Sequence, residues 1–116
     1  MSDESSQLLR GALRLLLLEL IAQGETYGYA AVVALRERGL ASAGEGTVYP
    51  ALQRLEREGL LSSRLAASRG GAARKYYRLT DDGERARRRV RAAWDDLVRV
   101  VDETIAAGQE QTDAPT

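Results

Sequence analysis

The sequence predicts one mainly α-helical domain with a single small β-hairpin. Apolar residues recur at helical spacing in four separate segments, and a Gly-Gly pair lies between two short stretches that favour strands. The chain has 116 residues, which is enough for one domain of ordinary size. Hydrophobic residues make up 44% of the chain and charged residues 29%, a balance that is typical of globular proteins.

The first two helices are expected from Leu8 to Gln23 and from Tyr27 to Arg38. Leucines occupy nearly the whole circumference of the first helix, so most of its sides should be buried. Gly24 ends this helix. The second helix closes on basic residues followed by Gly39, as is typical of a helix C-terminus. Residues Leu40 to Gly44 form a small, flexible connecting turn.

A third helix is expected to begin near Gly46 and to end at Gly59. Pro50 favours this start because a missing backbone N–H costs little only in the first turn. Ser42 and Glu45 have the spacing of a capping box. The inward stripe of this helix consists of Val48, Leu52 and Leu55. The opposite face carries Gly46, Pro50, Gln53 and Arg57, flanked by Thr47, Tyr49 and Arg54.

A hairpin is expected next, with strands from Leu60 to Ala66 and from Arg74 to Leu79. Tyrosines supply the residues that favour strand structure in its second half. The tip between the strands, Ser68 to Ala73, has Gly-Gly at its centre, which is typical of a tight turn.

The last element is a long helix over residues 80–107. Thr80 is expected to be its N-cap, and two aspartates follow where the helix dipole favours negative charge. Nothing in a small domain covers the whole length of its apolar stripe, so a partner helix and the first helix of a homodimer are expected to bury it. The stripe consists of Val90, Trp94, Leu97, Val101 and Ile105.

Charge is distributed unevenly along the chain, although the formal net charge is +0. Residues 45–79 contain seven Lys or Arg residues against three acids, whereas residues 1–44 and 80–116 both carry an acidic excess. This distribution indicates an anionic partner that binds at one face.

The sequence disfavours catalysis and metal binding. It contains no Cys and no His, so thiolate ligands, the usual general base and the commonest transition-metal ligand are all missing. The acidic pairs at residues 81–82 and 95–96 are explained by helix capping and by a solvated helix face. We therefore expect no catalytic residues, no metal and no cofactor.

The start of the chain is not typical of a secreted or membrane protein. Asp3 and Glu4 stand where a secretory signal would carry basic residues. The leucine run at residues 15–18 is followed by Glu19 and is too short to span a bilayer. A cytoplasmic location without a membrane partner is therefore expected.

The order helix, helix, helix, hairpin, long helix is the layout of a winged helix-turn-helix. Residues 1–79, ordered from about residue 8, would form the DNA-binding domain, and the second helix of the motif would expose Arg and hydroxyl groups. Residues 80–107 would form a C-terminal dimerisation helix, and residues 108–116 a flexible tail.

Five blocks of the chain, from about residue 8 to residue 83, resemble the PadR family of regulators in both residues and order. The most specific are the Gly-Thr-Val-Tyr-Pro segment at residues 46–50 and the Tyr-Tyr-Arg-Leu-Thr segment at residues 76–80. The single C-terminal helix resembles the shorter PadR subgroup. The chain departs from the family where Thr26 replaces a frequent His and where Ala72 and Ala73 replace a frequent Pro. The matching blocks are residues 8–13, 27–29, 45–52, 55–60 and 74–80.

This resemblance implies a homodimeric repressor that binds an inverted-repeat operator in double-stranded DNA and is released by a small effector or stress signal. The outward residues of the third helix would enter the major groove, and basic wing residues would contact phosphates. Recognition-helix contacts are expected from Thr47, Tyr49, Pro50, Gln53, Arg54 and Arg57. Wing and other backbone contacts are expected from Tyr29, Arg69, Gly70, Gly71, Arg74 and Lys75.

Each of these assignments has a plainer alternative. The polar face of the third helix is also what a solvated helix presents, and Arg57 sits between two glutamates that can neutralise it. Trp94 either anchors the core or dimer interface or, with Leu97, stacks on a flat and largely apolar effector. A winged-helix module that binds another protein is the alternative function.

Overall fold

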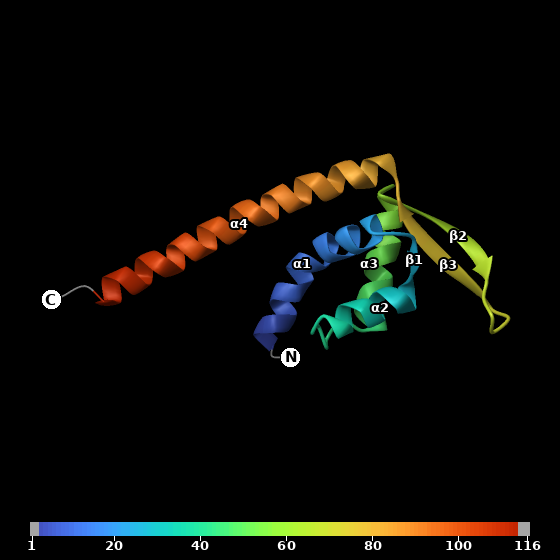
Figure 1. Cartoon of the computed structure of the whole chain (residues 1–116), viewed down its shortest axis with the longest axis horizontal. Coiled ribbons are helices and arrows are strands. Elements are labelled where there is room, and N and C mark those ends of the chain that lie inside the picture. The colour runs from blue at the N-terminus through green and yellow to red at the C-terminus, as the bar shows by residue number, and fades with distance from the viewer. Residues whose placement is uncertain (1–2, 114–116) are drawn as a thin grey trace.

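The computed structural model describes residues 3–113. In chain order its elements are α1 (Asp3–Ala22), β1 (Thr26–Tyr27), α2 (Gly28–Glu37), α3 (Glu45–Arg57), β2 (Leu61–Ala67), β3 (Ala73–Leu79) and α4 (Asp81–Asp113). Figure 1 shows α1, α2 and α3 gathered at one end of the molecule, the hairpin beside them, and α4 extending away as one long rod. The mainly helical fold with a small hairpin is therefore confirmed.

The core lies where α1, α2 and α3 meet the base of the sheet. Leu17 and Leu18 of the leucine run are fully buried, and so is Leu52 of α3. The expectation that α1 is buried on most sides is wrong, because Leu8 is 76% exposed and the flank it occupies has no cover within the chain. The remaining core is built from Leu9, Leu13, Ile21, Ala31, Val32, Leu35, Ala43, Val48, Leu55, Leu60, Leu61, Tyr77 and Ala86.

The sheet has three antiparallel strands in the order β1-β3-β2. In the hairpin, Leu61 pairs with Leu79 and Ala67 with Ala73. β2 is therefore shifted by one residue toward the tip, and β3 begins one residue earlier than expected. β1 adds Thr26 opposite Tyr77. The sequence did not predict β1, because two residues carry no alternating pattern.

α3 begins within one residue of the expected start, but it lacks the expected cap. The helix begins at Glu45, Gly44 is its N-cap, and no side chain caps it, so the predicted capping box is wrong. Pro50 lies in the second turn rather than in the first. A proline there removes the hydrogen bond to the Gly46 carbonyl. Both residues are exposed, so that carbonyl is open to solvent.

The start of α4 is fixed by Thr80, as the sequence predicted. The backbone N–H of Gly83 donates to Thr80 Oγ1 at 3.0 Å, and that hydroxyl donates to the carbonyl of Gly59 at 2.6 Å. The predicted end at residue 107 is wrong, because the helix continues to Asp113. Gln and Glu in this segment are good helix formers, so polarity alone does not end a helix. Residues 114–116 of the expected tail lie outside the described residues.

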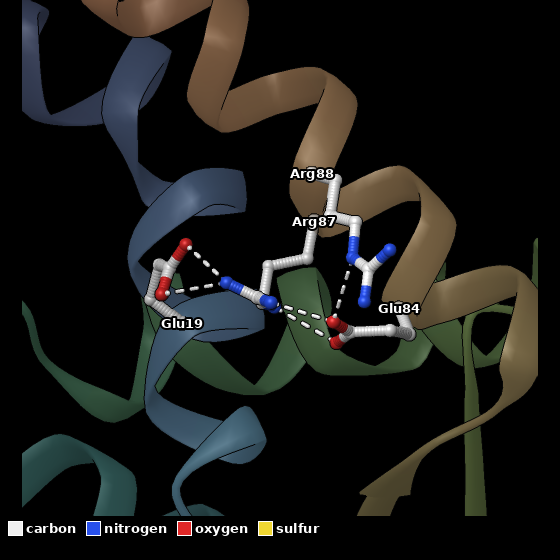
Figure 2. Close-up of polar contacts among 4 residues, drawn as sticks. All are labelled: Glu19, Glu84, Arg87 and Arg88. Carbon is white, nitrogen blue, oxygen red and sulfur yellow. Dashed lines mark hydrogen bonds and ion pairs between the residues drawn. The ribbon is translucent and has the colours of Figure 1, made fainter.

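An arginine joins α4 to α1. Arg87 Nη1 lies 3.1 Å from Glu19 Oε1 on α1, and Arg87 Nη2 lies 2.5 Å from Glu84 Oε1 one turn earlier on α4. Figure 2 shows the guanidinium between these two carboxylates, and Arg88 contacts the same oxygen of Glu84. The Arg87 side chain is only 18% exposed. This junction sets the direction in which α4 leaves the domain.

Candidate nucleic-acid interface

Two exposed arginines of α3 are neutralised by no acid: Arg57 on the outward face and Arg54 on one flank of that face. Val48, Leu52 and Leu55 are buried, as predicted, so Pro50, Gln53 and Arg57 on the opposite side face solvent. Within residues 3–113, Arg54 and Arg57 have no ion-pair partner. The flanking glutamates do not neutralise Arg57, because Glu56 pairs with Lys75 and Glu58 with Arg14.

Tyr49 connects α3 to α2. Its ring lies directly against Gly28, where an added Cβ would stand 1.9 Å from Tyr49 Cε1. The side chain is half-buried, and burial, followed by the nearby Glu45, raises the pKa of its hydroxyl. Only glycine at position 28 therefore allows the two helices of the motif to pack this closely. Tyr49 points toward α2 rather than straight outward.

An open groove of about 430 Å³ runs between the start of α2, α3 and β3. Arg74 lies over the Tyr27 ring with its guanidinium carbon 4.5 Å from the ring centre. Tyr27 is also the N-cap of α2 and makes no side-chain cap, so the first N–H groups of α2 remain available. A helix N-terminus and an arginine together favour an anion here. The groove is lined by Tyr27, Gly28, Tyr29, Tyr49, Arg74, Lys75 and Tyr77.

The hairpin tip is exposed and basic. Arg69, Gly70 and Gly71 are all exposed, and Gly71 has a φ of 88°, which favours glycine. Arg69 has no ion-pair partner among the described residues. Leu65 on β2 is 72% exposed beside this tip.

Lys75 is tied to α3 instead of being free at the wing surface. Its Nζ lies 2.7 Å from Glu56 Oε1, and the hydroxyl of Ser63 donates to the other oxygen of the same carboxylate. Lys75 and then Ser63 lower the pKa of Glu56, and Glu56 raises the pKa of Lys75. The sequence did not predict the ion pair between Glu56 and Lys75, because nothing in the spacing of these residues shows that the hairpin folds back onto the end of α3.

A second ion pair lowers the free charge of the hairpin. Arg64 Nη2 lies 2.5 Å from Glu25 Oε1, and the pair lowers the pKa of Glu25. The Arg64 guanidinium carbon also lies 5.1 Å from the centre of the Tyr76 ring. Among residues 45–79, the arginines without an acidic partner are therefore Arg54 and Arg57 on α3, Arg69 at the hairpin tip, and Arg74 and Arg78 on β3.

Most of the apolar stripe on α4 has no cover within the chain. Val90 is half-buried against the core, but Trp94 is 42% exposed and Ile105 is 55% exposed. Leu97 and Val101 are exposed as well, and neighbouring Val98 and Val100 widen the stripe. Every residue from 91 to 111 is exposed. The predicted interface residues thus form a continuous apolar surface.

Two other classes of feature are absent from residues 3–113. No three acidic side chains gather closely enough there to hold a metal ion. In the same part of the chain, no helix is long and apolar enough to cross a membrane. Asp81 and Asp82 lie in the first turn of α4, where negative charge complements the helix dipole.

Comparison with known proteins agrees with this geometry. A family model described as the transcriptional regulator PadR-like family matches residues 17–89. A transcriptional regulator of Mycobacterium tuberculosis is 38% identical over 103 residues, which cover 89% of this chain and 91% of that protein.

Solved structures of PadR-like regulators also resemble this chain. A PadR-like transcriptional regulator from Bacillus cereus is 34% identical, with a TM-score of 0.77, and the match covers 85% of this chain and 96% of that one. A PadR family transcriptional regulator from Eggerthella lenta is 38% identical, with a TM-score of 0.76, covering 85% of this chain and 86% of the other. The winged helix-turn-helix expected from the sequence is therefore confirmed, and so is the resemblance. The chain is a transcriptional regulator rather than an enzyme, and it belongs to the PadR-like family.

Proposed function

We propose that this protein is a homodimeric repressor that binds an inverted-repeat operator in double-stranded DNA, in the cytoplasm. One observation carries the proposal: the solvent-facing side of α3 presents two unpaired arginines, Arg57 on its outward face and Arg54 on its flank, beside a basic hairpin. A protein-binding winged helix has no need of both features.

In this proposal the two elements have different tasks. α3 has the size to enter the major groove, where an arginine such as Arg57 reads guanine by two hydrogen bonds. Arg69 and Arg74 on the hairpin meet phosphates, which adds affinity without sequence information. Lys75 contributes less to phosphate binding than expected from sequence, because its ammonium group is paired with the Glu56 carboxylate.

The α4 stripe is the surface through which we propose that two copies of the chain pair. Burying one large apolar side chain stabilises an interface by about 1.5–3 kcal/mol. Pairing two α4 helices buries the exposed Trp94, Leu97, Val101 and Ile105 of both copies. A two-fold dimer then presents two copies of α3 to two half-sites, and this symmetry requires an inverted repeat.

Release by an effector is the finer part of the proposal. Trp94 lines none of the grooves described above, but it stands exposed on the stripe with Leu97 one turn away. A flat, largely apolar molecule that stacks on the indole between paired helices would weaken DNA binding if it favours the DNA-free geometry.

The test compares binding to the protein's own upstream DNA with binding to random DNA over a range of salt concentrations. Arg57→Ala should weaken operator binding by about 1–3 kcal/mol and random binding much less. Arg74→Ala should weaken both and reduce the slope of log affinity against log salt by about 0.9. The control is Arg89→Ala, an exposed arginine on α4. Absence of DNA binding by the wild-type protein would favour the protein-interaction alternative.

A further inference from the structure

A shallow basic trough follows the seam between α1 and α3. One part, of about 100 Å³, is lined by Arg10, Leu13, Arg14, Ala51, Arg54 and Leu55. The adjoining part, of about 200 Å³, is lined by Ser6, Leu9, Arg10, Ser42 and Thr47. Arg10 belongs to both parts. The sequence predicted α1 as a core helix that also helps to cover the α4 stripe, and it predicted no binding role for this seam.

The trough lies on one flank of α3, and the hairpin lies on the other. Tyr49 packs on α2 and Glu56 binds Lys75, so these two residues mark the flank that faces α2 and the hairpin. Thr47 and Arg54 lie on the opposite flank, at helical spacing, and both line the trough beside α1. The outward face with Arg57 lies between these two flanks.

α1 also has two different flanks. Glu19 faces α4, where it binds Arg87. Leu8, 76% exposed, lies three turns earlier on that same side of the helix by its spacing. Arg10 and Arg14 face α3 instead. A partner helix that covers the apolar flank therefore leaves the basic flank open.

Charge and size together indicate what the trough binds. Arg10 and Arg54 have no ion-pair partner among the described residues, while Arg14 is 2.6 Å from Glu58. Three guanidinium groups against one carboxylate, with hydroxyl-bearing residues at one end, favour an anion with several oxygens. Pockets for small molecules usually measure about 300–1,000 Å³. Both parts of the trough are smaller than that, so a small molecule would remain largely in solvent.

We propose that this trough binds the sugar-phosphate backbone on the side of α3 opposite the hairpin. The major groove has a phosphate backbone on each side and is about 12 Å wide, so a helix inside it has one strand along each flank. The hairpin and the start of α2 hold one strand, and Arg10 with Arg54 holds the other. This inference rests on the proposed DNA binding and adds a second set of phosphates to it.

The experiment measures salt dependence and phosphate ethylation interference on one operator fragment. Arg10→Ala should weaken operator and random DNA alike and reduce the salt slope by about 0.9, the loss expected for one phosphate contact. Ethylated phosphates that block the wild-type protein should fall into two sets. Arg10→Ala should lose sensitivity in one set, and Arg74→Ala in the other.

The control Arg89→Ala removes another exposed arginine, which lies outside the trough, and should change neither measurement. An unchanged salt slope for Arg10→Ala, or loss of the same phosphates as with Arg74→Ala, overturns the second backbone site alone. Failure of the wild-type protein to bind either DNA overturns both proposals. Circular dichroism checks that each variant is folded.

Discussion

The two parts of α4 have the same helical geometry but different surroundings. In residues 81–90, Gly83 and Ala86 are buried against the domain, Val90 is half-buried, and Arg87 is held by carboxylates of two helices. In residues 91–111 every side chain is exposed, although this part contains the only Trp and several large aliphatic residues. The first part is held by its own chain, whereas the second part has no cover within the chain and is the surface that we propose pairs with another copy.

The largest effect, a loss of dimerisation, is expected when charged residues are placed on the exposed part of α4. Leu97→Glu with Val101→Glu removes two apolar side chains and places carboxylates in the proposed seam. With about 1.5–3 kcal/mol lost for each side chain, dimerisation should weaken at least about 100-fold. Light scattering or sedimentation at micromolar concentration measures this loss.

The matched control is Arg99→Glu, on the side of the helix opposite Leu97 and Val101, which should remain dimeric. A double variant that is still dimeric, or a wild-type protein that is monomeric, would show that α4 does not form the interface.

Two glycines on the same helix should respond in opposite directions. At Gly83 an added Cβ would stand 2.0 Å from the carbonyl oxygen of Leu60, so Gly83→Ala should destabilise the fold by about 1–3 kcal/mol. At Gly108 nothing lies within 4 Å of an added Cβ, so Gly108→Ala should stabilise the helix by about 0.5–1 kcal/mol. Urea unfolding measures both values. Equal effects would mean that the two parts of α4 have similar surroundings.

A smaller effect is expected at the junction, and it should depend on pH. Arg87, followed by Arg88, lowers the pKa of Glu84 from 4.5 to about 2. A carboxyl group with a lowered pKa stabilises the fold above its unfolded pKa, and this stabilisation is lost as pH falls from 4.5 to about 2. Glu84→Gln should therefore destabilise the wild-type fold at neutral pH and converge with it in acid. Unfolding curves that differ by the same amount at every pH would contradict this.

The smallest effect concerns Trp94. Its emission should shift to shorter wavelength as the protein concentration rises, because pairing of α4 buries an indole that is 42% exposed in the single chain. Trp94→Phe should keep DNA binding but lose its response to flat apolar compounds. A variant that still responds to such an inducer would leave Trp94 with a packing role only.

Sequence periodicity predicted the features that depend on local spacing. Val48, Leu52 and Leu55 face inward as their spacing requires, and Thr80 caps α4 because its hydroxyl lies three residues before an N–H donor. Contacts between distant segments were not predictable in this way. Arg87 and Glu19 are 68 residues apart, and their pairing depends on how α4 crosses α1.

The same distinction between local spacing and distant contacts applies to the candidate site. The exposed arginines of α3 follow from helical spacing, whereas the Glu56–Lys75 pair depends on where the hairpin packs. The end of α4 was missed for another reason. The residues after 107 are polar, which is typical of a tail, but several of them also favour helix, and the helix continues through them.

α4 is one continuous helix from Asp81 to Asp113. The orientation of the helix at the Arg87 junction therefore fixes the direction in which the apolar stripe faces. Each residue turns the helix by about 100°, so one residue inserted between Arg87 and Trp94 would turn the stripe away from its partner. An insertion of seven residues would restore the direction to within about 20° and lengthen the rod by about 10 Å. The number of residues in this segment therefore sets both the orientation and the separation of the two α3 helices in a dimer.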